Sequence, residues 1–312
     1  MKSRILVISA AEMELLMLCD RIPSAGETIR GKGYEYIPGG KGTNAAVTLS
    51  RLGGDCVFCS CLGDDENGAK LRRYYNECGV DTRFLATDRN AKTGFTAAIC
   101  EKNDNLRALT FRGASDLLTR EHIEEAFTCY PDAVYVQTVL ESRLLAKATR
   151  FAVQQKIPVF IDASGIGKEY PFEELESIEI FQTSAQDAYR ITGIMPTDME
   201  NCMKSAMALE SRVKAKFYVI RIPGRGAFIY DGRYYQMQPT YDVDRADTAE
   251  AADAFNASLA LNYLTTHDIK NACSFASAVG EVTTDMHESL DPIPELRKVR
   301  EYILSFKPSI KM

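Results

Sequence analysis

Asp253 is the residue whose type and position point most directly to catalysis. It falls in the first turn of a predicted buried helix, in which apolar residues recur at i, i+4 and i+8 from Ala251. Asp247 and Thr248 are candidates for capping that helix. Backbone N–H groups of a first turn have no partner within the helix and attract anions. Asp253 is therefore either a general base beside an anion site or an acid favoured by the helix dipole.

A glycine-rich segment offers a second candidate contact for a ligand. It reads Pro38-Gly39-Gly40-Lys41-Gly42-Thr43-Asn44. The glycines allow the backbone to approach a ligand closely, and Lys41 adds a positive charge. The spacing differs from G-x-x-x-x-G-K-[ST], so the segment is not a Walker P-loop. A helix is predicted to follow and to stop at Gly53-Gly54.

Short aliphatic runs alternate with longer amphipathic ones, which predicts a mainly parallel sheet covered by helices on both faces. Two segments, Glu27 to Ile37 and Thr93 to Phe111, alternate as strands without a helix between them. We expect them to form hairpins outside the sheet, as a lid or a subunit contact. The predicted strands of the main sheet are Ile5 to Ile8, Cys56 to Leu62, Ala133 to Val136, Pro158 to Ile161, Ile178 to Phe181 and Phe217 to Ile220.

The composition limits the classes of function. The 312 residues are 46% hydrophobic and 26% charged, as in a globular protein. A net charge of −6 argues against nucleic acid or an anionic membrane as a partner. The N-terminal apolar run is too short for a secretory signal, so we expect a cytoplasmic protein. Its nine cysteines are then free thiols, and Cys56, Cys59 and Cys61 fit a buried strand better than a metal site.

Several motifs occur in a characteristic order. They are Pro23-Ser24-Ala25-Gly26-Glu27-Thr28, Gly39-Gly40-Lys41-Gly42-Thr43-Asn44-Ala45-Ala46, Arg51-Leu52-Gly53, Leu62-Gly63-Asp64-Asp65 with Gly68, Phe111-Arg112-Gly113-Ala114, and Asp247-Thr248 with Asp253-Ala254-Phe255-Asn256. In this order and spacing, over nearly the whole chain, the sequence resembles the ribokinase-like, or PfkB, family of carbohydrate and nucleoside kinases.

The resemblance implies one ribokinase-like domain over residues 1–312, an αβα sandwich of Rossmann-like type with a small β-sheet lid formed by about residues 27–37 and 93–111. It implies transfer of the ATP γ-phosphate to a hydroxyl of a sugar or nucleoside, with Mg²⁺ and a homodimer formed through the lid strands. Asp253 is then the expected base, and the backbone of Ala251 and Ala252 the expected anion hole. The expected substrate contacts are Gly40, Lys41 and Asn44.

The nucleotide side departs from the family pattern. The family has Gly-Ala-Gly-Asp where this chain has Glu250-Ala251-Ala252-Asp253. A carboxylate at 250, about 5 Å from a phosphate, costs on the order of 3 kcal/mol at an effective dielectric of about 20, unless it turns away or binds Mg²⁺. Ala252 is a mild change if its φ stays negative.

Three further nucleotide-side motifs differ. The resemblance places Ser184 and Asp187 where the family often has Asn-x-x-Glu, and makes Asp187 the candidate Mg²⁺ contact, acting through water. Beneath the nucleotide it places Arg221, Gly224 and Gly226, and either Pro223 replaces a glycine or the loop is one residue shorter. Glu288-Ser289 replaces the Gly-Ala segment near the adenine and the possible monovalent cation.

The substrate side differs as well. Glu12 and Glu14 stand where the family usually has an Asn and an Asp that grip substrate hydroxyls, and residues two apart on an extended segment share a face. With Glu250 and Asp253 they give four acids against Lys41, unless Glu12 or Glu14 points to solvent. We hypothesise that the ligand carries an amine or arrives with a divalent ion.

Two functions follow from these patterns. The first is an active kinase, supported by Asp253, Lys41, Asn44 and the lid strands. The alternative is a catalytically impaired protein that binds a small ligand without phosphoryl transfer, supported by Glu250, Ser184, Pro223 and Glu288.

Overall fold

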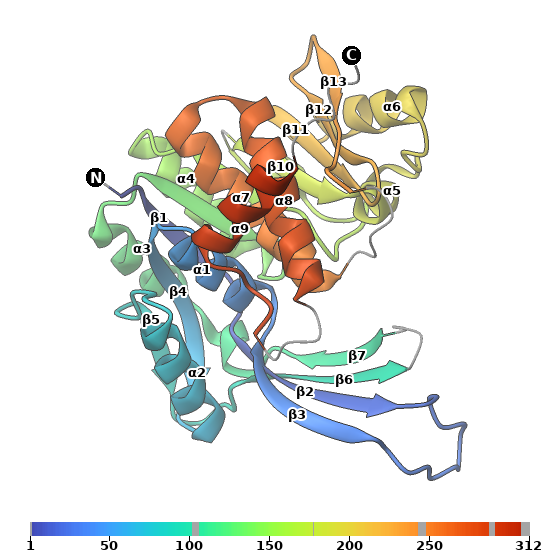
Figure 1. Cartoon of the computed structure of the whole chain (residues 1–312). Helices are drawn as coiled ribbons and strands as arrows, with labels where there is room; N and C mark the ends of the chain where they lie inside the picture. The colour runs from blue at the N-terminus through green and yellow to red at the C-terminus, as the bar shows by residue number, and fades with distance from the viewer. Residues whose placement is uncertain (1, 102–105, 177, 243–247, 287–290, 307–312) are drawn as a thin grey trace.

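The computed structural model describes residues 2–101, 106–176, 178–242, 248–286 and 291–306. Within them the chain forms two β-sheets, a large one covered by helices and a small one that extends from it (Figure 1). Asp247, a candidate cap of the helix that carries Asp253, lies outside the described residues, as do Glu288 and Ser289, which the family resemblance places near the adenine.

The large sheet has nine strands in the order β13-β12-β11-β10-β9-β8-β1-β4-β5. Neighbouring strands from β5 to β11 are parallel, and β12 and β13 extend the sheet as an antiparallel pair. The predicted strands are confirmed, whereas β5, β12 and β13 were not predicted. The bounds are β1 Arg4–Ile8, β4 Asp55–Gly63, β5 Leu85–Asp88, β8 Ala133–Gln137, β9 Val159–Asp162, β10 Ile178–Ser184, β11 Ala215–Ile222, β12 Gly226–Tyr230 and β13 Tyr235–Gln238.

Helices cover both faces of this sheet, which confirms the αβα sandwich. Alternate residues of β1 enter opposite cores: Ile5 and Val7 pack on one side, Leu6 and Ile8 on the other. The first core contains α1 Lys41–Arg51, α2 Glu66–Glu77, α7 Ala249–Thr266, α8 Ile269–Asp285 and α9 Leu296–Ser305. The second contains α3 Arg120–Ala126, α4 Ser142–Gln154, α5 Ala185–Thr192 and α6 Met199–Glu210. Short 3-10 turns occupy Gly113–Leu117, Phe127–Cys129 and Phe172–Glu174.

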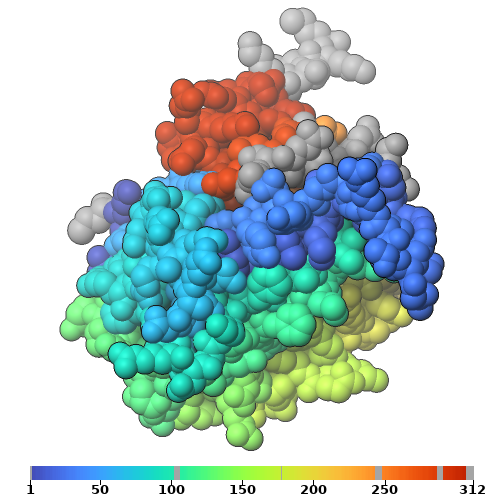
Figure 2. Space-filling view, turned by 90° about the horizontal axis from the view of Figure 1, so that it is seen from below, coloured from blue at the N-terminus to red at the C-terminus, as the bar shows by residue number. Residues whose placement is uncertain are grey.

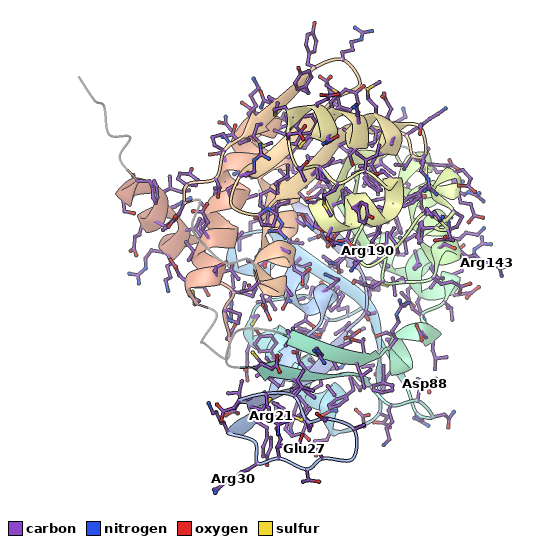
Figure 3. The ribbon with its side chains drawn as sticks, turned by 90° about the vertical axis from the view of Figure 1, so that its right-hand side faces the viewer. Arg21, Glu27, Arg30, Asp88, Arg143 and Arg190 are labelled. Atoms are coloured by element: carbon purple, nitrogen blue, oxygen red, sulfur yellow. The ribbon has the colours of Figure 1, made fainter. Side chains whose placement is uncertain are left out.

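The small sheet differs in part from the predicted hairpins. Its order is β3-β2-β6-β7, with β2 and β6 parallel and the other pairs antiparallel. The strands are β2 Glu12–Cys19, β3 Gly33–Gly39, β6 Gly94–Glu101 and β7 Leu106–Phe111. The strand prediction for residues 27–32 was wrong. They form a loop that begins with a turn, in which Glu27 N–H donates to Ser24 O (3.0 Å), and Glu27 pairs with Arg21 (Figure 3).

Cys56, Cys59 and Cys61 lie in the buried strand that the sequence analysis predicted. Cys56, Cys59 and Cys61 are free and buried in β4, and the described residues contain no cluster of three or more His, Cys, Asp or Glu side chains suited to a metal. In the same residues, no helix combines the length and the apolar character needed to cross a membrane.

Candidate active site

The start of α7 positions Asp253. Thr248 caps the helix, because its side-chain oxygen accepts the N–H of Ala251 at 3.2 Å. The helix is apolar on nearly all sides and packs against the sheet, α1 and α8, so Asp253 is only 2% exposed. The carboxylate is therefore held on a rigid, buried element next to the N-terminus of a helix.

The start of α1 positions Lys41 and Asn44. These residues are three apart and share one face of the helix. The chain enters α1 through Gly40, whose φ of +81° favours glycine, and a Cβ on Gly42 would lie 2.1 Å from Ala10 O. These glycines allow α1 to pack closely against the segment that follows β1 and against β2, and their close approach to a ligand stays a prediction.

The two helix starts meet at the Asp253 carboxylate. Lys41 Nζ lies 3.1 Å from Asp253 Oδ1, and Asn44 Nδ2 donates to Asp253 Oδ2 at 2.9 Å. Burial raises the pKa of Asp253 to about 6, and the charge of Asp162 adds to the effect, while Lys41 and Asn44 oppose it. The attraction of Asp253 raises the pKa of Lys41, which keeps the ammonium charged.

A cavity of about 340 Å³ opens beside this pair. It brings together residues from both halves of the chain, including Lys41, Asp253 and Ala252 with Ser184, Asp187 and Arg221. A neighbouring cavity, which shares Arg221, is lined by Gly224 and Gly226. The described residues that were predicted for the nucleotide side therefore line the cavity at Asp253 or the cavity next to it. Glu250 is the exception, because it borders neither cavity.

Asp187 lies in the cavity wall with its carboxylate already engaged. Oδ2 accepts from Ser184 Oγ at 2.7 Å, and Oδ1 accepts from Gly165 N–H at 3.1 Å and from Arg190 Nη1 at 2.9 Å. Arg190 lies on α5 at the side of the large sheet that faces the small sheet (Figure 3). Since each oxygen has a donor and the charge is paired, Asp187 suits Mg²⁺ held through water better than direct ligation.

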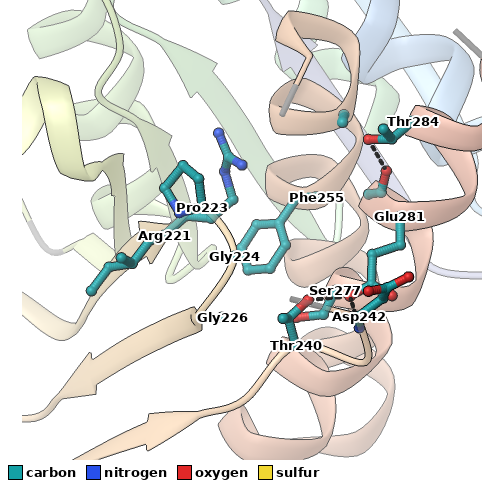
Figure 4. A pocket seen from close by; sticks show the side chains of 13 residues that line it. Arg221, Pro223, Gly224, Gly226, Thr240, Asp242, Phe255, Ser277, Glu281 and Thr284 are labelled. Atoms are coloured by element: carbon teal, nitrogen blue, oxygen red, sulfur yellow. Dashed lines mark hydrogen bonds between the residues drawn. The ribbon is translucent and has the colours of Figure 1, made fainter. Parts of the chain in front are cut away.

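Pro223 lies in a tight turn in the loop after β11. Arg225 N–H donates to Ile222 O at 3.0 Å, and Gly224 has φ +68°, as in a type II turn with proline at its second position. Gly226 has φ +110°, and a Cβ there would lie 2.0 Å from Gln238 O. Phe255 points from α7 toward this turn (Figure 4). Proline and glycine thus shape a tight turn at the cavity edge.

The expected anion hole is partly occupied by the helix itself. Ala252 is helical, so its φ is negative as the sequence analysis required. However, the N–H of Ala251 donates to Thr248 Oγ1, and the N–H of Ala252 donates to Thr248 O at 3.1 Å. An anion at this helix start has to share these donors with Thr248. The sequence analysis named Thr248 as a candidate cap of this helix, and the structure confirms it.

Glu12 and Glu14 lie in β2 of the small sheet, and the charges of Glu12 and Glu250 both act on Glu14. Glu12 is buried and its Oε2 accepts from Thr96 Oγ1 at 2.7 Å, while the Glu14 carboxylate lies against Gly39, where a Cβ would be 2.8 Å from Oε2. Burial, followed by the charges of Glu250 and Glu12, raises the pKa of Glu14 to about 7. The charge of Glu250 therefore acts on Glu14 of the small sheet, and Glu250 borders neither of the two cavities described above.

Asp162 is a site residue that the sequence analysis missed. It ends β9, borders the 340 Å³ cavity and is fully buried. Ligands bind at the carboxyl edge of a parallel sheet, so a polar residue at the end of an apolar strand can indicate a site residue. The run Val159-Phe160-Ile161-Asp162 carries that signal.

The model of the pfkB family carbohydrate kinases matches residues 2–296. The chain is 24% identical over 302 residues to a Bacillus subtilis ribokinase, covering 96% of this chain and 99% of the relative. It is 23% identical over 305 residues to a Salmonella typhi deoxyribokinase, covering 95% and 99%.

A solved structure of Arabidopsis thaliana ribokinase complexed with ribose and ATP superimposes with a TM-score of 0.85 at 20% identity, over 97% of this chain and 99% of the other. At this identity the structural likeness shows the fold, and the family match shows the relationship. The chain belongs to the pfkB family of carbohydrate kinases.

Proposed function

We propose that this protein transfers the γ-phosphate of ATP to a hydroxyl of a sugar or nucleoside, with Asp253 as the base. The observation that carries the proposal is the buried Asp253 carboxylate, held at 3.1 Å by Lys41 and at 2.9 Å by Asn44 where α1 and α7 begin. The relatives named above are kinases, and they give no support to the alternative of a binding protein without transfer activity.

The residues present account for the steps that such a transfer needs. The substrate hydroxyl donates its proton to Asp253 as its oxygen attacks the γ-phosphorus, and the bond from phosphorus to the ADP oxygen breaks. Lys41 offers a positive charge beside the base and the developing negative charge. Asn44 holds the second carboxylate oxygen, so that the base keeps one orientation.

Mg²⁺, when bound with ATP, neutralises phosphate charge. Asp187 and Ser184 fit an ion held through water, because Asp187 Oδ2 accepts one hydrogen bond and keeps a free lone pair, while Arg190 pairs the charge of the carboxylate. Arg221, Gly224 and Gly226, which line the cavities next to Asp253, would border the donor. The possible monovalent cation was linked to residues outside the described ranges and stays a sequence-based expectation.

We expect an acceptor with a positive charge to be preferred. Glu12, Glu14 and Glu250 crowd together, and Lys41 is already paired with Asp253, so an ammonium group on the acceptor would relieve their repulsion. D-glucosamine should bind at least about tenfold more tightly than D-glucose or N-acetyl-D-glucosamine, as one partly desolvated charge pair allows. Isothermal titration calorimetry measures all three affinities.

The Glu14→Gln variant tests whether Glu14 causes the preference for D-glucosamine. It should remove most of the advantage of D-glucosamine and leave D-glucose unchanged, whereas Glu66→Gln, on the exposed surface of α2, should change neither. Equal affinity of the wild type for the charged and the neutral sugars would contradict a cation-selective acceptor site.

We also propose that the protein is a homodimer formed through the small sheet. Strand alternation places Tyr34 and Tyr36 of β3 on one face with Leu109 and Phe111 of β7, and these side chains are 52–68% exposed. The same face borders an apolar cavity. In the view from below, the blue N-terminal part of the chain, which includes β2 and β3, reaches the surface (Figure 2). Such a patch is typical of a subunit contact.

Tyr36→Lys should convert this dimer to a monomer, because a charge then has to be buried in an apolar contact. Sedimentation velocity measures the change, and Tyr234→Lys, on the exposed turn after β12, is the matched control. A wild-type protein that sediments as a monomer at micromolar concentration would contradict the dimer.

A further inference from the structure

Asp162 is a buried acid beneath the candidate base for which the mechanism above has no use. Its side chain is fully buried at the end of β9, and it borders the cavity that Lys41 and Asp253 also line. Oδ1 has no hydrogen-bond partner among the residues that the structure describes. A buried carboxylate oxygen without a donor is costly, so it calls for a partner at some stage of the catalytic cycle.

The other oxygen of this carboxylate is fixed by a hydrogen-bonded chain. Asp162 Oδ2 accepts from Gln137 Nε2 at 2.9 Å and from Tyr135 OH at 3.3 Å. Ser9 Oγ donates to Gln137 Oε1 at 2.5 Å, which orients the amide so that its N–H points to Asp162. The ends of β1, β8 and β9 thus hold the carboxylate in one orientation and leave Oδ1 unused.

Lys41 is the nearby donor with unused capacity. An ammonium group has three N–H donors, and among the described residues Lys41 uses one of them, toward Asp253 Oδ1. Its side chain is 32% exposed, so it has room to move within the cavity. While Lys41 and Asn44 each donate to one oxygen of Asp253, they make the carboxylate a weaker base toward an incoming substrate hydroxyl.

We propose that Asp162 is a positioning residue that receives Lys41 when the acceptor binds: the ammonium passes from Asp253 Oδ1 to Asp162 Oδ1, which frees the base for the substrate hydroxyl. The inference rests on the proposed function. Asp162 would accept the hydrogen bond of Lys41 once Lys41 has left Asp253, so the positive charge of Lys41 stays in the cavity.

The electrostatics agree with this geometry. The negative charge of Asp162 raises the pKa of both Lys41 and Asp253. The other charged groups that act on Lys41 include Asp187, and Lys41 in turn lowers the pKa of Glu12. Removing the charge of Asp162 therefore changes the titration of the base in a predictable direction.

The test is the pH profile of kcat/KM for D-ribose with ATP in Asp162→Asn. We expect kcat to fall at least about tenfold, and the midpoint of the acid limb to move to lower pH by about one unit, because a charge that disfavours ionised Asp253 is gone. Ser164→Ala is the matched control, since its hydroxyl also has no partner among the described residues and borders the same cavity without a charge. It should leave the midpoint unchanged.

A double-mutant cycle tests the link to Lys41. In a Lys41→Met background, the Asp162→Asn substitution should reduce kcat much less than in the wild type, because its partner is already gone. If Asp162→Asn does not fold, Asp162→Ser removes the same charge with a smaller side chain. A folded variant with an unmoved acid limb, or additive effects in the cycle, overturns the proposal while the kinase function stands. A wild type without transfer activity overturns both.

Discussion

Asp253→Asn should abolish most phosphoryl transfer while leaving ligand binding nearly intact. The amide keeps the shape of the side chain but cannot take the proton of the attacking hydroxyl, so kcat should fall about 100- to 10,000-fold. The KM values for the acceptor and for ATP should change little, since Asp253 is buried at the base of the cavity. Steady-state kinetics with ADP detection measure both quantities.

Asp198→Asn is the control for this variant. Asp198 caps α6 far along the chain, accepts from Asn201 N–H at 2.9 Å, and asparagine caps a helix equally well. It should retain full activity. Thermal unfolding separates lost chemistry from lost folding, because Asp253→Asn removes the charged partner of Lys41. A folded Asp253→Asn protein with wild-type kcat would show that another group is the base.

Lys41→Met should produce the second large loss, of about 100- to 1,000-fold in kcat, which is typical when one electrostatic contact to the developing charge is removed. The substitution should also move the acid limb of the pH profile to higher pH. Lys41 lowers the pKa of Asp253, so its loss leaves burial and Asp162 to raise that pKa further. A pH series of kcat/KM measures the shift.

The shift expected for Lys41→Met is opposite in sign to that expected for Asp162→Asn, so one series of profiles tests both electrostatic assignments. Lys41→Arg keeps the charge and should keep the midpoint near that of the wild type. Lys70→Met, on the exposed face of α2, controls for the loss of a surface lysine. If the midpoint in Lys41→Met moves down or stays in place, the charge of Lys41 does not act on the base.

The large sheet could be predicted because its strands are uninterrupted apolar runs, such as Ile5 to Ile8, buried between two helix layers. β2 could not. Its sequence Glu-Met-Glu-Leu-Leu-Met-Leu-Cys has no β-branched residue and favours a helix by intrinsic propensity. Its pairing with β3 and β6 makes it a strand despite this propensity. Residues 27–32 show the opposite case, because they alternate like a strand but form a loop.

The sequence predicted which residues belong to the site better than it predicted their contacts. Lys41 and Asp253 are 212 residues apart, so only the family resemblance connected them before the fold was known. The engagement of Asp187 by Arg190, and of the Ala251 and Ala252 amides by Thr248, depends on rotamers and helix capping. The position of Glu250 near Glu14 depends on how the small sheet folds over the start of α7. The contact of Lys41 with Asp253 depends on the fold, whereas the Thr248 cap was already a candidate from local sequence.

The most direct test of the proposed mechanism is the pH dependence of phosphate transfer from [γ-³²P]ATP to D-ribose by the wild-type protein. Because the base acts in its ionised form, labelled sugar phosphate should form at neutral pH, and its rate should fall as the pH drops through about 6, the pKa of Asp253. Release of inorganic phosphate without labelled sugar across a panel of sugars and nucleosides, or a transfer rate that is flat from pH 5 to about 8, would contradict Asp253 as the base of a kinase.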